Sequence, residues 1–161
     1  MLAFVMFANA QVLLDELNNN SDGIPPNSTV LSFSHFSFGH NVAPNGAQSL
    51  FFFDVPDLVV SRNALPASAK VASDPKNPAM PIRFFIYSKD DAYNSVTSLL
   101  HTAYATRANV SVIFKNPVAN LLKNEREYLL DPSTQYCYVN YYNGKPFSIH
   151  CPIMALTLGS N

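Results

Sequence analysis

Histidine side chains can bind metal ions and transfer protons, but the spacing of the histidines in this chain matches no standard metal site. His35 and His40 lie five positions apart and have no cysteine partner, a pattern that zinc sites do not use. His101 and His150 lie far from them in the sequence. The sequence therefore predicts no metal site and no cofactor.

Nucleophilic and acid–base catalysis also lack a signature. The sequence has no Gly-x-Ser-x-Gly turn to expose a strained nucleophile, and no glycine-rich phosphate loop. The neighbouring Asp90 and Asp91 precede a helical pattern, so we interpret them as helix caps and not as the carboxylate pair of a glycosidase. We expect no catalytic residues and a protein that is not an enzyme. A secreted hydrolase is the third-ranked alternative.

The residues best suited to bind a ligand surround Asn143-Gly144, a dipeptide that favours a tight β-hairpin turn. Exposed tyrosine rings stack on sugar rings, and asparagine amides hydrogen-bond to hydroxyl groups at low entropic cost on a rigid turn. We therefore predict Asn140, Tyr141, Tyr142 and Asn143 as ligand-binding residues. The alternative is that the tyrosines pack across the sheet, as tyrosines in strands commonly do.

The N-terminal residues indicate export from the cell. Residues 1–11 are uncharged and largely apolar, and they close in Ala8-Asn9-Ala10, the small-x-small pattern that signal peptidases cleave. No basic residue precedes the apolar run, so we interpret residues 1–10 as the remnant of a longer signal peptide. A buried N-terminal helix continuing to Leu17 is the alternative. The sequence thus predicts a secreted or periplasmic protein, with residues 11–161 forming a single β-rich domain.

The two cysteines, Cys137 and Cys151, flank the predicted turn. An even pair behind an export signal most simply forms a disulfide. A two-residue turn would place Cys137 opposite His150, one position short of Cys151, so a bulge or a three-residue loop is needed to bring the sulfurs together. Two buried free thiols are the alternative.

Composition narrows the class of partner. Ten Lys and Arg residues stand against eleven Asp and Glu, with neither sign in a block, so the basic surface expected for nucleic acid is missing. No apolar run approaches the roughly 20 residues that span a bilayer. We expect a glycan or protein ligand, no nucleic acid and no membrane span. The sequence leaves homo-oligomerisation open.

Hydrophobic periodicity predicts a strand-rich chain. The predicted strands are 29–38, 48–53 with an extension to 60, 82–87, 109–114 and the hairpin 136–158. The first of these alternates with a one-residue phase slip after His35, which we interpret as a bulge in a bent strand. Residues 39–46 are predicted to form a loop, and residues 62–81 a long excursion over the surface.

One principal helix is predicted over residues 90–104. Its apolar residues recur at helical spacing and form one stripe, consisting of Val96, Leu99, Leu100 and Ala103. Residues 118–130 are compatible with a second, short helix that Asp131-Pro132 would end.

A helix-to-strand junction and a late cysteine-bearing strand carry a resemblance to a known family. The run from Ser98 to Phe114 passes from helix to a Val-Ser-Val strand with a very short connection, and a final strand begins at Cys151. Both features resemble the B subunits of subtilase-like and pertussis-like AB5 toxins, over about residues 82–158. The chain departs from that family at Arg107-Ala108-Asn109, where a glycine is usual, and in its insertion over 62–81. No glycan-contacting residue is carried over.

The resemblance implies a secreted protein with the OB-fold that binds glycans. Combined with the periodicity, it leads us to predict a β-rich α+β domain, an OB-like small barrel with one main helix. The expected function is that of a secreted, non-enzymatic binding module, a glycan-binding subunit similar to a toxin B subunit. The alternative is a secreted or periplasmic protein-interaction domain, such as an inhibitor, without sugar binding.

Overall fold

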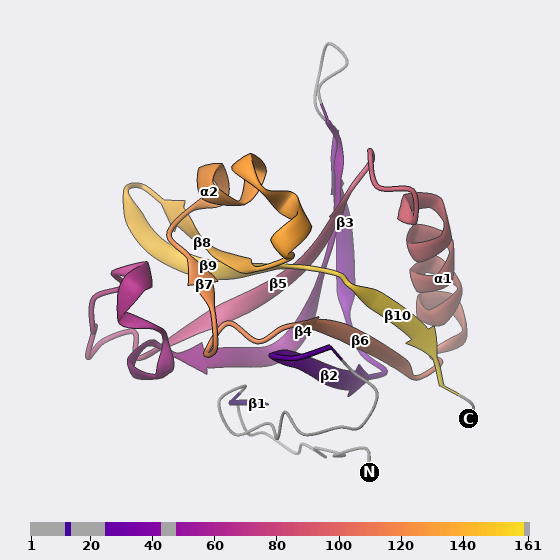
Figure 1. The fold of residues 1–161 in the computed structure, drawn as a ribbon. Coiled ribbons are helices and arrows are strands. Elements are labelled where there is room, and N and C mark those ends of the chain that lie inside the picture. The colour runs from indigo at the N-terminus through magenta and orange to yellow at the C-terminus, as the bar shows by residue number, and fades with distance from the viewer. Residues whose placement is uncertain (1–11, 14–24, 43–47, 160–161) are drawn as a thin grey trace.

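The computed structural model describes residues 12–13, 25–42 and 48–159, and it shows a strand-rich α+β protein (Figure 1). The predicted signal-peptide remnant, residues 1–10, lies outside the described residues. The strands are β1 (Val12–Leu13), β2 (Ser28–Phe33), β3 (Ser37–Asn41), β4 (Leu50–Ser61), β5 (Ala79–Tyr87), β6 (Val110–Lys115), β7 (Leu121–Leu122), β8 (Cys137–Tyr142), β9 (Lys145–Pro152) and β10 (Ala155–Leu158). The α-helices are α1 (Tyr93–Thr106) and α2 (Glu125–Leu130).

The described strands form two sheets. The larger one has seven strands in the order β1-β4-β5-β9-β8-β7, with β3 also paired to β4, and it curls into a half-barrel. The smaller one has the order β10-β6-β2. Figure 1 shows α1 alongside β10 at one side of the molecule and α2 over β8 and β9 at the other. The predicted α+β class and strand-rich character are therefore confirmed.

One face of the larger sheet carries the main core. Strand alternation points Phe51 and Phe53 of β4 and Phe84 of β5 to this face, where all three side chains are fully buried. They pack with Phe114 of the smaller sheet and Leu100 of α1. Burying rings of this size removes a large apolar area from water, which is the main favourable contribution to folding.

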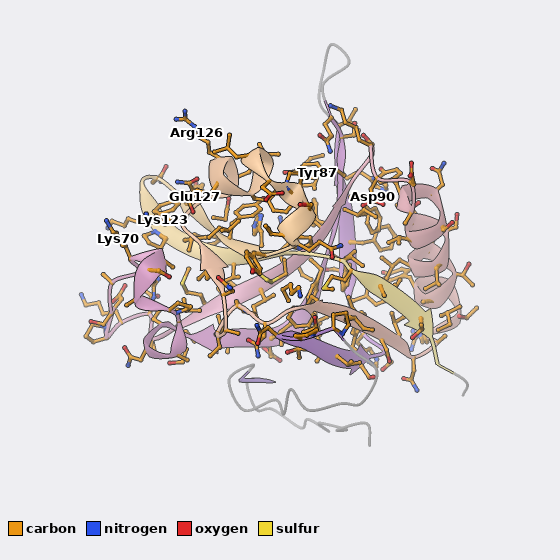
Figure 2. All side chains as sticks on the ribbon, viewed as in Figure 1. Lys70, Tyr87, Asp90, Lys123, Arg126 and Glu127 are labelled. Carbon is orange, nitrogen blue, oxygen red and sulfur yellow. A yellow bond between two sulfur atoms is a disulfide. The ribbon has the colours of Figure 1, made fainter. Side chains whose placement is uncertain are left out.

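The opposite face of the sheet is covered only in part. Phe85, Tyr128 and Tyr138 form a second buried cluster where α2 lies over the sheet. Tyr87, labelled in Figure 2, ends β5 beside this cluster, and its hydroxyl donates a 2.8 Å hydrogen bond to Glu125. The remainder of this face, toward the other end of β5, carries a groove whose lining includes Asp54, Arg83 and His150.

The phase slip after His35 marks a change of sheet, so its interpretation as a bulge in one strand is wrong. Strand β2 belongs to the smaller sheet and β3 to the larger one. Phe33 and Phe36 stay buried on either side of the crossing, with ring centroids 5.5 Å apart. A slip in alternation looks the same for a bulge and for a chain that passes from one sheet to another, because only the tertiary partners differ.

The loop predicted over 39–46 is also wrong in its first residues. Gly39 to Asn41 belong to β3 and pair with β4, whereas residues 43–47 lie outside the described residues. Gly39 serves the strand by its small size, since a Cβ there would lie 2.5 Å from the ring of its cross-strand partner Phe52.

The principal helix is confirmed, with shifted ends. It begins at Tyr93, and its N-cap is Ala92, which makes no side-chain capping bond, so the interpretation of Asp90 and Asp91 as helix caps is wrong. The Asp90 carboxylate instead accepts a 2.8 Å hydrogen bond from the Ala92 N–H in the turn before the helix. Val96, Leu100 and Ala103 are buried as predicted, whereas Leu99 is only half-buried. None of the described helices has the length and apolar character needed to cross a membrane.

The second helix is shorter than the range 118–130 suggests. Residues 121–122 form β7, and α2 begins after Asn124, whose side chain accepts a 3.0 Å hydrogen bond from the Glu127 N–H. Asparagine is a favoured N-cap, so the helix begins where the cap stands.

Candidate functional site

The β8–β9 hairpin has the predicted two-residue turn. Asn143 and Gly144 both adopt positive φ angles, 50° and 73°, and the flanking Tyr142 and Lys145 pair directly. Such a turn matches the right-handed twist of the two strands, which explains why this dipeptide ends one strand and begins the next.

Further from the turn, the register of the hairpin shifts by one residue. A two-residue turn alone would pair Tyr138 with Ile149. Because β9 contains a bulge, Tyr138 pairs instead with the next residue, His150. The shift brings Cys137 beside Cys151, and a disulfide joins them. The predicted disulfide and the predicted bulge are both confirmed, and together they brace the base of the hairpin.

The bulge leaves Phe147 without a partner in β8. Its side chain is 56% exposed, and its ring centroid lies 5.7 Å from that of Tyr142, which is 65% exposed. Sequence reasoning missed Phe147. The signal was present, because the bulge had to fall between the turn and Cys151, and a bulged residue is turned away from normal pairing.

A first groove, of about 670 Å³, lies between the hairpin tip and the segment that joins β4 to β5. Figure 1 shows this segment beside the hairpin on the left of the view, and Figure 2 labels Lys70 on it. Tyr142 and Phe147 line the hairpin side of the groove, and Asp74 and Asn77 line the opposite side. Aromatic rings thus face amide and carboxylate groups across an open space.

Arg62 ties the two walls of this groove together. Its Nε donates a 2.6 Å hydrogen bond to the Asn77 carbonyl, and its Nη2 donates a 3.1 Å bond to the Pro146 carbonyl. Asp74 accepts 3.0 Å bonds from the Asn77 amide and the Lys76 N–H, and these bonds lower its pKa. The carboxylate is therefore ionised at neutral pH.

A second groove, of about 330 Å³, lies on the uncovered face of the large sheet. It runs beside the irregularity in β4 between Asp54 and Val59. Arg83 donates two hydrogen bonds to the Asp54 carboxylate, at 2.9 and 2.7 Å, and its guanidinium lies 3.9 Å from the centre of the Phe52 ring. This planar, two-bonded pair holds both charges in place.

His150 also lines the second groove, and it is neutral at physiological pH. Burial lowers the pKa of its imidazole to about 4, with a further lowering from the nearby positive charge of Arg83. The Tyr138 hydroxyl lies 3.4 Å from its Nδ1. The imidazole can therefore exchange a hydrogen bond with a ligand but adds no charge to the groove.

Ser148, His150 and Asp54 share this groove, which is the combination that a hydrolase would use. Their contacts do not link them into a triad. The Ser148 hydroxyl accepts a 3.3 Å bond from the Asn140 amide, and Arg83 occupies both oxygens of Asp54. A nucleophile needs a hydrogen-bonded base that is itself oriented by a third group, and these contacts supply neither link.

Three of the four predicted ligand residues line the two grooves. Tyr142 and Asn143 line the first groove and Asn140 lines the second. Tyr141 is 43% exposed and lines neither groove. Tyr138 is buried and packs against Phe85 and Tyr128. For this tyrosine, the alternative that the hairpin tyrosines pack across the sheet is correct.

Within the described part of the chain, no group of three or more His, Cys, Asp or Glu side chains is placed to hold a metal ion. The arrangement offers rings, amides, hydroxyls and paired charges, all of which suit binding. Comparison of the chain with protein-family models, with curated proteins and with solved structures finds no match in any of the three.

Proposed function

We propose that this protein is a secreted carbohydrate-binding module whose ligand lies against the β8–β9 hairpin. The observation that carries the proposal is the exposed pair Tyr142 and Phe147 at the edge of a groove that also presents Asp74 and Asn77. Aromatic faces stack on the apolar faces of sugar rings, while amide and carboxylate groups bond to ring hydroxyls.

Rigidity of the hairpin supports this function. The disulfide closes its base, and Arg62 holds its tip to the opposite wall of the groove. A site that is ordered before binding loses little conformational entropy when the ligand arrives, so more of the contact energy contributes to affinity.

The proposal extends to location and topology. A disulfide persists in oxidising compartments, which supports secretion or export to a periplasm. The half-barrel has one groove on an uncovered sheet face and one beside a loop, and this supports an OB-like arrangement, since OB-folds bind ligands on a sheet face and its adjoining loops. We also propose that the protein is similar to the B subunits of AB5 toxins.

A glycan array tests the proposal. The wild-type protein should bind at least one class of glycan, and Tyr142→Ala and Phe147→Ala should each lower binding by about tenfold or more. Tyr104→Ala is the matched control, because Tyr104 is also an exposed aromatic residue, at 56%, but belongs to α1. Tyr141→Ala should have a smaller effect, since Tyr141 lines neither groove.

Two results would defeat the carbohydrate proposal. One is a wild-type protein that is silent on a broad array yet captures one specific protein, which would favour the inhibitor-like interaction domain. The other is binding that survives in both Tyr142→Ala and Phe147→Ala, with thermal unfolding of the variants unchanged.

A further inference from the structure

The two grooves adjoin each other. Phe147 and Pro81 line both of them, so the bulged ring stands at the junction and not at the end of a closed pocket. The outward-facing residues Ala79, Pro81 and Arg83 of β5 run along the same path. At the rise of a β-strand, this path is about 13 Å long, which exceeds the length of a single sugar ring.

The two grooves together form a trough along β5, and irregularities in two strands border this trough. One is the bulge at Phe147 in β9, and the other is the register shift in β4 that contains Asp57, which has a positive φ of 62°. Bulges bend a strand and redirect its side chains, and they are common beside binding sites. Here the two bulges lie in strands on either side of β5.

Charge along the trough is balanced. Its ionisable lining residues, leaving aside the neutral His150, are the cations Arg62, Arg83 and Lys145 and the carboxylates Asp54, Asp57 and Asp74. Arg83 and Asp54 neutralise each other directly. An anionic ligand would gain from the three cations but lose against the three carboxylates, so the lining favours an uncharged ligand with many hydroxyl groups.

The strand edges along the two grooves are paired only in part. Strand β5 pairs with β9 only over Ile82–Phe85 and Ile149–Pro152. Beside the first groove, Ala79–Pro81 pair with β4 alone, and Lys145, Pro146 and Ser148 pair with β8 alone. Recognition by strand addition needs a free edge. On the β9 edge the Pro146 carbonyl already accepts a bond from Arg62, so a peptide strand would have to displace that bond, whereas the side chains of Asn140 and Phe147 line the grooves.

We propose that the ligand is an uncharged, linear oligosaccharide that lies across Phe147 and occupies both grooves. This inference rests on the proposed carbohydrate-binding function and specifies the ligand class for the same site. Sugar units on one side of Phe147 lie against Tyr142 and Asn77, and units on the other side lie near Asn140 and the Arg83–Asp54 pair.

An array of defined oligosaccharides tests this inference. It would carry neutral oligomers of glucose, N-acetylglucosamine, mannose, galactose and xylose, from one to six units, beside sialylated, sulfated and uronic acid glycans. Neutral oligomers should bind about tenfold or more tightly than their own monosaccharide. Equal affinity for monomer and oligomer, or a preference for the anionic glycans, would overturn the inference while leaving carbohydrate binding intact. Silence toward every glycan would instead defeat the proposed function.

Variants in the second groove separate a long ligand from a short one. Asn140→Ala should weaken binding of the longer oligomers severalfold and weaken binding of the shortest binding sugar less. Asp57→Gly should act in the same direction, and it preserves the fold because glycine adopts the positive φ of this exposed position readily. If both variants bind the longer oligomers as wild type does, the ligand does not enter the second groove and the inference is wrong.

Discussion

His150 illustrates how surroundings change the chemistry of one residue. In an unfolded chain its imidazole titrates near pH 6.5, whereas in the fold burial and Arg83 lower its pKa to about 4. Between these two values the unfolded state binds a proton that the folded state does not bind. Stability contributed by this group is complete above pH 6.5 and is lost as the pH falls toward 4.

We therefore predict that acid destabilises the protein partly through His150. The free energy of unfolding should fall between pH 6.5 and 4, with a slope from this group below the limit of about 1.4 kcal/mol per pH unit, because the ring is half-buried. His150→Gln should flatten the pH dependence measured by urea unfolding. His35→Gln, at an exposed histidine, is the control, and equal slopes in all three proteins would contradict the assignment.

Leu100 is a second residue whose role the fold makes specific. It lies on α1 and is fully buried in the main core. We expect Leu100→Ala to lower the free energy of unfolding by about 2–5 kcal/mol, through lost burial and the cavity left behind. Leu130→Ala, at a side chain that is 79% exposed, should change it by less than about 0.5 kcal/mol. Denaturant unfolding of both variants gives the comparison.

Among the elements, the β8–β9 hairpin contributes most to the candidate site. Its turn, bulge and disulfide act together, because the bulge corrects the register that the turn sets and the disulfide then holds that register. The same bulge exposes Phe147. A local irregularity in pairing therefore provides both the covalent link and the aromatic surface.

Removing the disulfide should destabilise the protein and loosen this hairpin. The cysteines are 14 positions apart, and closing a loop of that size contributes about 3 kcal/mol in the chain-entropy model. We expect the double variant Cys137→Ala/Cys151→Ala to lose about this amount in urea unfolding. Wild type treated with a reducing agent should match it, and two alkylatable thiols in the folded, non-reduced wild type would contradict the link.

For the whole molecule, the distribution of charge matters more than its sum. The chain has a net charge of −1, and the trough combines equal numbers of cationic and anionic side chains. Binding there should depend on ring stacking and short hydrogen bonds, which salt screens weakly.

Affinity for a bound glycan should therefore change less than about twofold between roughly 50 mM and 0.5 M NaCl, over which the Debye length shortens severalfold. Calorimetric titration at several salt concentrations measures it. A tenfold loss across this range would mean that charge drives binding and that the ligand is ionic. Lys145→Ala, which removes an exposed cation at the hairpin, should bind with unchanged salt dependence.

Features formed by neighbours in sequence were predictable. The helix stripe around Leu100, the turn at Asn143-Gly144 and the bulged register that joins the cysteines all depend on the φ preferences and spacing of nearby residues. Tyr142 and Asn143 also line a groove for this reason, because a turn exposes the residues beside it.

Only the tertiary structure decided which distant segments meet. Arg62 bonds to Pro146, 84 positions away, and so makes a groove from two segments that show no relation in the sequence. Likewise, the chain passes from one sheet to the other between β2 and β3, and only the strand pairings distinguish this crossing from a bulge. Sequence patterns report the local backbone and the side of an element that is buried. They do not report which partner buries it, because many partners bury the same apolar face equally well.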